Sequence, residues 1–137
     1  RGREHIHMTQ IQVNELTLSD CLTFSRGVSA SQILESMRAS QTTESYILSE
    51  DGSLYGKLDL HNLVANMEEF ESNLDQSPTS LDTANSLTEA LEIASDFVGE
   101  SIPVMDGEIF IGAITEGDLF KKVLEIEDSL RAQDSVL

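Results

Sequence analysis

The sequence lacks residues on which several classes of protein depend. It has no tryptophan, two prolines, one cysteine and only 5% aromatic residues in a chain of 137. With Cys21 as the single cysteine, neither an internal disulfide nor a cysteine-based zinc site can form, which is typical of a reducing compartment. No apolar run approaches the roughly 18 residues of a membrane-spanning helix, and no signal peptide is visible. The core must therefore be mainly aliphatic.

Positive charge is also scarce, because 8 basic residues stand against 25 acidic ones and the formal net charge is −17. Such a chain repels polyanions, which excludes direct binding of nucleic acid. The motifs of common catalytic sites are missing as well: there is no Gly-rich phosphate loop with a lysine and no nucleophile elbow. We therefore expect a protein that is not an enzyme, built as one domain or as two very small docked ones.

One segment of the chain occurs twice, 56 positions apart. The residues Tyr-Gly-Lys-Leu-Asp-Leu-His-Asn-Leu-Val at 55–64 correspond to Ile-Gly-Ala-Ile-Thr-Glu-Gly-Asp-Leu-Phe at 111–120. Residues 45–48 align with 101–104 at the same offset, whereas residues 29–32 align with 86–89 at offset 57. The first copy thus carries one extra loop residue. A duplication of this size predicts two pseudosymmetric repeats whose halves complete each other's core.

Each copy predicts the order strand, helix, strand, strand, helix. Ser29 with Gln32, and Ser86 with Glu89, match the reciprocal capping box in which a hydroxyl and an amide or carboxylate satisfy orphan backbone donors. Two helices are therefore expected to start at these serines.

Two hairpins and two further helices complete the predicted repeats. Gly52 and Gly107 each follow an aspartate between apolar runs, which is a strong signal for a tight hairpin turn. The closing helices are expected over residues 60–70 and 117–130. The last of them carries an apolar stripe at helical spacing, formed by Leu119, Val123, Ile126 and Leu130.

The doubled pattern, together with the line formed by Gly112, Thr115 and Asp118, resembles a tandem pair of cystathionine-β-synthase (CBS) domains, often called a Bateman module. The resemblance covers about residues 20–130 and is closer in the second repeat. It implies an α+β (α/β) fold of two β-α-β-β-α repeats packed with pseudo-twofold symmetry. The implied boundaries are a linker at 1–19, a first repeat at 20–70, an acidic linker at 71–80, a second repeat at 81–131 and a tail at 132–137.

CBS pairs are mostly regulatory attachments to transporters, channels and enzymes, and they commonly bind adenosine nucleotides and form dimers. The resemblance therefore implies a homodimer, which we expect to use the exposed stripe Val123, Ile126 and Leu130. A ligand-free module that only holds two subunits together is the alternative from a different functional class.

The first five residues, Arg-Gly-Arg-Glu-His, resemble the segment after the last membrane helix of bacterial ClC-type chloride channels and transporters. The chain also begins with Arg1 rather than Met, which suggests a piece of a longer polypeptide. We expect a regulatory module at the cytoplasmic face of the membrane, attached to a membrane domain of the same chain and soluble as an isolated fragment. A magnesium or other cation transporter, or a soluble enzyme, are alternative parents.

The resemblance also implies a ligand site in the second repeat. Asp118 would accept hydrogen bonds from the ribose hydroxyls, Thr115 would donate one to a phosphate, and Ile102 and Pro103 would lie near the base. Hydrogen bonds to a charged acceptor are about twice as strong as neutral ones, and the unpaired amides at a helix start favour an anion. The residues leave open the alternative that Asp118 only caps the last helix.

The charges near this site bear on the ligand. Glu116 adds a negative charge beside the supposed phosphate position, and the bases nearby are limited to Lys121 and Lys122. A triphosphate needs more positive compensation than that. The sequence therefore favours AMP or adenosine over ATP.

The first repeat departs from the pattern at both ligand positions. Asp59 stands where Thr115 stands, and Asn62 stands where Asp118 stands. An aspartate would repel a phosphate and an asparagine offers only a neutral acceptor, so we expect a degenerate site without nucleotide. No metal site is predicted: His61 is expected to be exposed, and a clip formed by two histidines, at positions 5 and 7, is a minor alternative.

Overall fold

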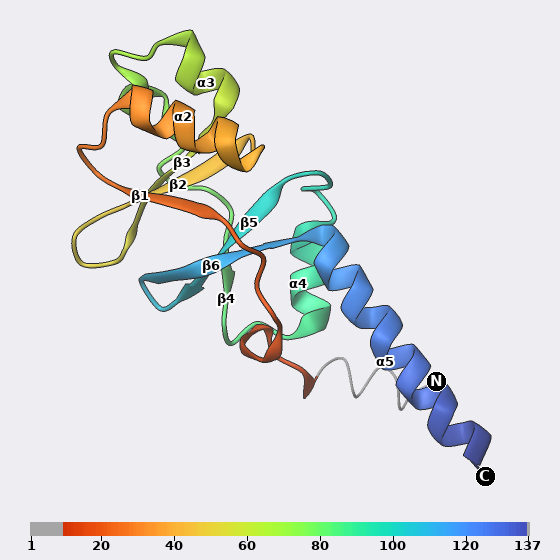
Figure 1. The fold of residues 1–137 in the computed structure, drawn as a ribbon. Helices are drawn as coiled ribbons and strands as arrows, with labels where there is room; N and C mark the ends of the chain where they lie inside the picture. Colours follow the sequence, from red (N-terminus) through yellow and green to blue (C-terminus); the bar gives the residue numbers. More distant parts are fainter. Residues whose placement is uncertain (1–9, 137) are drawn as a thin grey trace.

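The computed structural model describes residues 10–136, and these form two repeats with the same order of elements (Figure 1). The first contains β1 (Leu22–Ser25), α2 (Ala30–Ser40), β2 (Glu44–Leu48), β3 (Leu54–Asp59) and α3 (Leu60–Ala65). The second contains β4 (Leu81–Asp82), α4 (Leu87–Ala94), β5 (Ser101–Asp106), β6 (Ile109–Thr115) and α5 (Glu116–Val136). One 3-10 helix comes before each repeat, η1 (Val13–Glu15) before β1 and η2 (Phe70–Asn73) before β4.

Each repeat forms one three-stranded mixed sheet, with its first strand parallel to its second and its second antiparallel to its third. The α+β fold of two β-α-β-β-α repeats is confirmed. The segment at residues 1–9, which includes the basic residues and both histidines of the predicted linker, lies outside the described residues.

The predicted helix starts are confirmed because both depend on local chemistry. Ser29 Oγ accepts a hydrogen bond from the Gln32 amide at 3.3 Å, and Ser86 Oγ accepts one from the Glu89 amide at 3.1 Å. The Glu89 carboxylate in turn accepts from the Ser86 amide at 2.9 Å. Both serines therefore close capping boxes that satisfy amides a helix start would otherwise leave unpaired.

The two hairpin turns are also confirmed. Gly52 has φ +88° and Gly107 has φ +65°, in the left-handed region that glycine adopts without steric cost. The strands on either side of each turn pair antiparallel, β2 with β3 and β5 with β6.

The alignment of residues 45–48 with 101–104 is wrong by one position. Ser45 pairs with Leu58 across the first hairpin, and Ile102 pairs with Ile114 across the second. The partners on β3 and β6 are 56 positions apart, but Ser45 and Ile102 are 57 apart, so the extra residue lies in the first hairpin turn. A slip of one residue exchanges the two faces of a strand. The true counterpart of Pro103 is Tyr46.

Both closing helices differ from the predicted ranges. α3 ends at Ala65 rather than near residue 70, because Asn66 leaves the helical conformation and its side chain accepts from the Glu69 amide at 3.2 Å. The turn that follows lets Phe70 enter the core of the first repeat. α5 runs on to Val136, so residues predicted as a tail continue the last helix.

Each repeat is completed by a segment that precedes the other repeat. Residues 10–19, which we call the N-terminal strap, come before β1 but lie along the second repeat (Figure 1). The Ser19 amide donates to the Ala113 carbonyl of β6 at 2.9 Å. The counterpart segment, residues 70–75, comes before β4 but pairs with β3, where the Lys57 amide donates to the Asp75 carbonyl at 2.9 Å. This exchange ties the two repeats into one unit.

The N-terminal strap and its counterpart segment each pack closely against a glycine, and the two glycines are equivalent. A Cβ on Gly56 would lie 3.0 Å from Leu74 Cβ, and one on Gly112 would lie 2.7 Å from Leu18 Cδ1. These glycines are 56 positions apart, as are Leu18 and Leu74. The pseudosymmetry therefore includes the N-terminal strap and its counterpart segment, residues 70–75.

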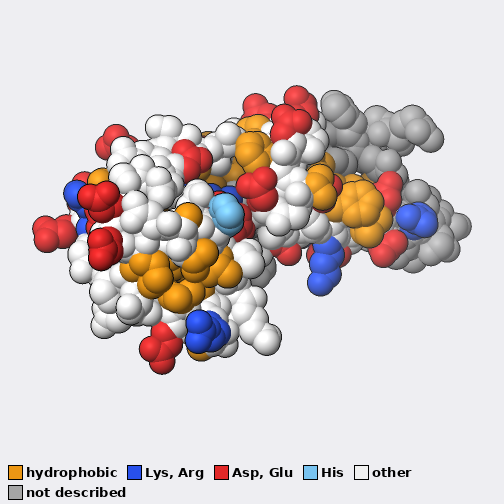
Figure 2. Space-filling model, turned by 90° about the horizontal axis from the view of Figure 1, so that it is seen from above, with side chains coloured by type: hydrophobic (Ala, Val, Ile, Leu, Met, Phe, Trp, Pro, Cys, Tyr) orange, Lys and Arg blue, Asp and Glu red, His pale blue; other side chains and the backbone are white. Residues whose placement is uncertain are grey.

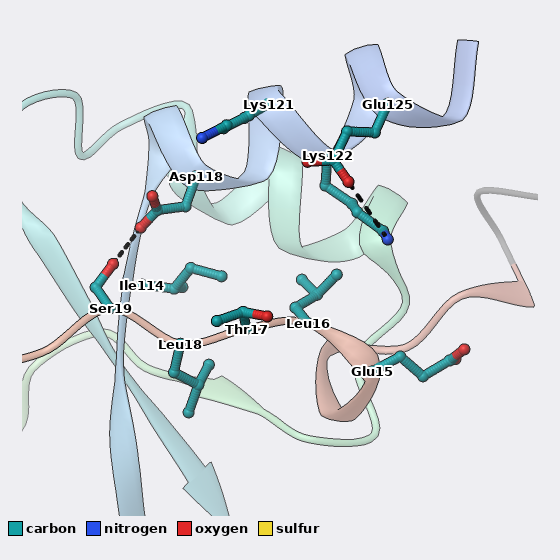
Figure 3. Close-up of a pocket in the computed structure, with 10 residues that line it drawn as sticks. All are labelled: Glu15, Leu16, Thr17, Leu18, Ser19, Ile114, Asp118, Lys121, Lys122 and Glu125. Atoms are coloured by element: carbon teal, nitrogen blue, oxygen red, sulfur yellow. Dashed lines mark hydrogen bonds and ion pairs between the residues drawn. The ribbon is translucent and has the colours of Figure 1, made fainter. Parts of the chain in front are cut away.

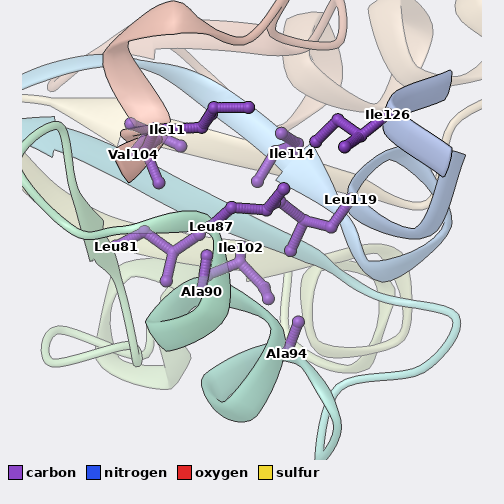
Figure 4. Packing of buried hydrophobic residues seen from close by; sticks show 11 residues of the cluster. Ile11, Leu81, Leu87, Ala90, Ala94, Ile102, Val104, Ile114, Leu119 and Ile126 are labelled. Atoms are coloured by element: carbon purple, nitrogen blue, oxygen red, sulfur yellow. The ribbon is translucent and has the colours of Figure 1, made fainter. Parts of the chain in front are cut away.

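The core of the second repeat is aliphatic and includes the strap. Ile11 and Val13 are buried together with residues of α4, β5, β6 and α5 (Figure 4). Ile126 belongs to this cluster, and Val123 and Leu130 pack against it. Of the stripe expected at a dimer interface, Ile126 is thus buried within the chain, whereas Val123 and Leu130 are half-buried where α5 packs on the second core.

The two sheets contact each other through a set of polar and aromatic groups. The Tyr46 ring lies 5.0 Å from the Phe110 ring, and its hydroxyl is 2.6 Å from Ser101 Oγ. Lys57 Nζ forms an ion pair with Glu44 at 2.9 Å and donates to the Ser101 carbonyl at 2.6 Å. The Glu44 carboxylate also accepts from the Ser101 amide at 2.9 Å. Side chains of the first sheet therefore hold the start of β5.

Candidate functional site

Thr115 and Asp118 meet at the junction between β6 and α5. Thr115 Oγ1 accepts a hydrogen bond from the Asp118 amide at 3.1 Å, and Asp118 Oδ2 accepts one from the Thr115 amide at 3.0 Å. This reciprocal pair is a capping box for α5. The structural role left open by the sequence is therefore present.

A third group, the Ser19 hydroxyl of the N-terminal strap, also donates to Asp118 Oδ2. Burial by itself would raise the pKa of the Asp118 carboxyl. The hydrogen bonds from Ser19 and Thr115 and the charge of Lys121 outweigh burial and hold that pKa below its ordinary value. Asp118 is consequently an ionised acceptor at neutral pH.

A cavity of about 360 Å³ opens between the strap and α5, with Asp118 on its wall (Figure 3). Apolar side chains contributed by the strap and β6 line one side, and these are Leu16, Leu18 and Ile114. The volume falls within the range of about 300–1,000 Å³ that is usual for small-molecule sites. The site thus combines apolar walls with one fixed carboxylate.

The charges around the cavity are mixed. Lys121 and Lys122 face it together with Glu15 and Glu125, and Lys122 lies 3.9 Å from the Glu125 carboxylate. With Asp118 included, three carboxylates stand against two ammonium groups in the lining. Such a site does not compensate several phosphate charges.

The two predicted base-contacting residues are buried on β5, the strand that pairs with β6. Ile102 is 1% exposed and packs in the core of the second repeat, and Pro103 is buried on β5. Neither lines the cavity at Asp118. The structure brings Thr115 and Asp118 together, although Thr115 is not among the residues that line the cavity. Ile102 pairs with Ile114, the residue before Thr115 on β6.

Sequence reasoning missed the strap residues of this site. Ser19 touches Asp118 although the two are 99 positions apart, and Leu16 and Leu18 form the apolar wall. The 56-residue offset does place Leu18 over Leu74. A single leucine match, however, does not distinguish a wall residue from an ordinary linker residue.

The equivalent cavity in the first repeat is smaller than the one at Asp118. Asp59 caps α3 by accepting from the Asn62 amide at 2.8 Å. The neighbouring cavity measures about 130 Å³ and is lined by Lys57 and Glu44 among others. Lys57, with its side chain 13% exposed, takes the place of the small Ala113 of β6.

Comparison with known proteins bears on the fold. No protein-family model matches the chain, and no curated protein matches it significantly. Among solved structures, CbpB in complex with c-di-AMP has a TM-score of 0.79 at 14% identity, covering 96% of this chain and 97% of that one. The CBS pair of a putative Mg²⁺ transporter from Shewanella oneidensis has a TM-score of 0.72 at 18% identity, covering 90% and 75%.

A third structure, CBSX2 in complex with AMP, has a TM-score of 0.70 at 17% identity and covers 85% of this chain and 98% of that one. The chain has the CBS-pair fold. At these identities the similarity concerns the fold alone. Within residues 10–136, no helix is long and apolar enough to cross a membrane, and no group of three His, Cys, Asp or Glu is placed to hold a metal ion.

Proposed function

We propose that this chain is a regulatory CBS pair that binds AMP or adenosine at Asp118 of the second repeat, and that it is not an enzyme. The observation that carries the proposal is the ionised Asp118 carboxylate on the wall of a cavity of about 360 Å³. Its Oδ1 atom accepts no hydrogen bond from the described part of the chain. A ribose hydroxyl can donate to it.

The cavity supports a nucleoside more than a polyphosphate. Leu16 and Leu18 supply an apolar surface for a base, and Lys121 lies near Asp118, where one phosphate can be accommodated. We therefore propose that the base contacts the strap and not Ile102 or Pro103. The first repeat, whose smaller cavity is lined by Lys57, is proposed to bind no nucleotide.

The regulated partner is proposed to be a chloride channel or transporter domain on the same polypeptide, with this module at the cytoplasmic face of the membrane. Similarity to the CBS pair of a putative Mg²⁺ transporter supports a transporter context and makes a cation transporter the runner-up. For regulation, the ligand must bind one arrangement of the module better than another, typically by about 1–3 kcal/mol.

Titration calorimetry with AMP, adenosine, ADP and ATP tests the ligand. We expect AMP or adenosine to bind more tightly than ATP, because the cavity lining carries three carboxylates against two ammonium groups. A preference for ATP would contradict the charge argument. No heat and no thermal shift with any of the four at millimolar concentration would reject the nucleotide site.

A ligand-free scaffold is the second candidate, and one observation favours it. Thr115, Asp118 and Ser19 satisfy one another by hydrogen bonds without a ligand.

Both repeats also expose apolar side chains on the closing helix: Val64 of α3 is 51% exposed and Phe120 of α5 is 53% exposed. These two positions are equivalent at offset 56.

An apolar groove accompanies Val64 on the first repeat. It has a volume of about 480 Å³ and runs between α2 and α3, where Leu34, Met37 and Leu60 line it. Figure 2 shows exposed apolar side chains on this part of the surface, next to a histidine. We propose that a second copy of the chain covers the helical faces of both repeats and forms a homodimer.

The dimer is expected in sedimentation experiments at about 100 μM protein. Replacing Val64 and Phe120 together by aspartate should convert it to monomer, because two charges would enter an apolar contact. Val98→Asp is the matched control, since Val98 is 71% exposed but lies outside the helices. A wild-type chain that sediments only as a monomer, or a double variant that remains dimeric, would contradict this interface.

A further inference from the structure

The hydrogen bonds at Asp118 are unevenly divided between its two oxygens. Oδ2 accepts from both the Ser19 hydroxyl and the Thr115 amide, whereas Oδ1 accepts from no described group. A carboxylate oxygen has about two acceptor positions. A ligand with two neighbouring hydroxyls that engages both oxygens therefore needs one of the positions on Oδ2.

Of the two groups on Oδ2, the Ser19 hydroxyl is the easier to displace. The Thr115 amide belongs to the capping box that starts α5, and losing its acceptor would leave a helix amide unpaired. The Ser19 hydroxyl needs only to rotate about one side-chain bond, while the Ser19 amide keeps its own partner, the Ala113 carbonyl at 2.9 Å.

We infer that the Ser19 hydroxyl is a placeholder for a ribose hydroxyl: a ligand with a cis-diol displaces it from Asp118, and Ser19 thereby sets how strongly the site prefers such ligands. This inference rests on the proposed nucleotide site. Ser19 competes with the ligand and does not hold it, because in the bound state its hydroxyl no longer contacts the Asp118 carboxylate.

The displacement also links the site to the strap. The hydrogen bond from the Ser19 hydroxyl to Asp118 connects the last residue of the strap to α5. Ile11 and Val13 anchor the other end in the second core, and the strap leads directly into β1 of the first repeat. Occupation of Asp118 is therefore expected to release this side-chain contact, while the backbone hydrogen bond between Ser19 and Ala113 stays in place.

The variant Ser19→Ala tests the inference in calorimetric titrations with AMP and 2′-deoxy-AMP at pH 7.5, where the carboxyl is ionised with or without the serine. AMP should bind about 3- to 10-fold more tightly to the variant, because the competing hydrogen bond is gone. The 2′-deoxy ligand can use Oδ1 alone, so its affinity should change less than about 2-fold.

Ser80→Ala serves as the control, since Ser80 is exposed and makes no side-chain hydrogen bond with the described residues; its affinity for AMP should match the wild type. Weaker or unchanged AMP binding by Ser19→Ala, or an equal gain for both ligands, would overturn the placeholder while leaving the nucleotide site intact. A titration that is silent for wild type and variant alike would overturn the nucleotide site and the placeholder with it.

Discussion

Replacing Tyr46 by alanine is expected to lower the free energy of unfolding by about 3–5 kcal/mol, the usual cost of deleting a buried aromatic ring. Tyr46 is 1% exposed and fills the space between the two sheets, where its ring packs on Phe110. Its hydroxyl contacts Ser101 Oγ at 2.6 Å. The loss would be measured by urea unfolding followed by circular dichroism.

Tyr46→Phe separates the ring from the hydroxyl. It keeps the packing and removes one hydrogen bond, so a loss of only about 0.5–1.5 kcal/mol is expected. Burial, partly opposed by the hydrogen bond with Ser101, raises the pKa of Tyr46, so the phenol stays neutral across the working range of the experiment. A loss below about 1 kcal/mol for Tyr46→Ala would contradict the view that this ring holds the repeats together.

Asp118→Ala should weaken AMP binding by about 10- to 150-fold, which corresponds to about 1.5–3 kcal/mol, because it removes the charged acceptor for the ribose. The same change removes the cap of α5 and the partner of Ser19. Asp118→Asn is therefore the sharper variant. It keeps the size of the side chain and an acceptor for the Thr115 amide but removes the charge, and it reproduces the residue type found at Asn62.

Asn62→Ala is the control in the first repeat. It should change AMP affinity by less than about 2-fold, because the cavity at Asn62 measures only about 130 Å³, below the usual range of about 300–1,000 Å³ for small-molecule sites. Calorimetry gives the affinities, and circular dichroism verifies that each variant is folded. An Asp118→Asn protein that binds AMP as well as the wild type does would show that the carboxylate is not the acceptor.

The local features of the fold could be predicted from the sequence. The two helix starts depend on a serine side chain that reaches an amide three residues away, at Ser29 and at Ser86. The two hairpin turns depend on a glycine that adopts positive φ, at Gly52 and at Gly107. The duplicated segment predicted that the fold consists of two pseudosymmetric repeats. Thr115 and Asp118 came together as predicted because they are three residues apart at a strand-to-helix junction.

Predictions that depended on distant contacts were less successful. The strand alignment was wrong by one residue because the extra residue of the first copy lies in a turn, and short apolar strands tolerate either register in the sequence. α3 ends early because Asn66 leaves the helical conformation, and the turn that follows lets Phe70 pack in the first core. The stripe on α5 packs partly inside the chain, with Ile126 buried and Val123 and Leu130 half-buried against the second core.

By itself, the sequence determined the class of the fold, its two repeats, its helix starts and the carboxylate at residue 118. Only the tertiary structure decided which surroundings that carboxylate has. Ser19, Leu16 and Leu18 reach the site because the strap before one repeat packs on the other, across 99 positions of sequence in the case of Ser19. Contacts of that range follow from the packing of whole elements, because no local pattern in the sequence specifies which distant segment fills a given groove.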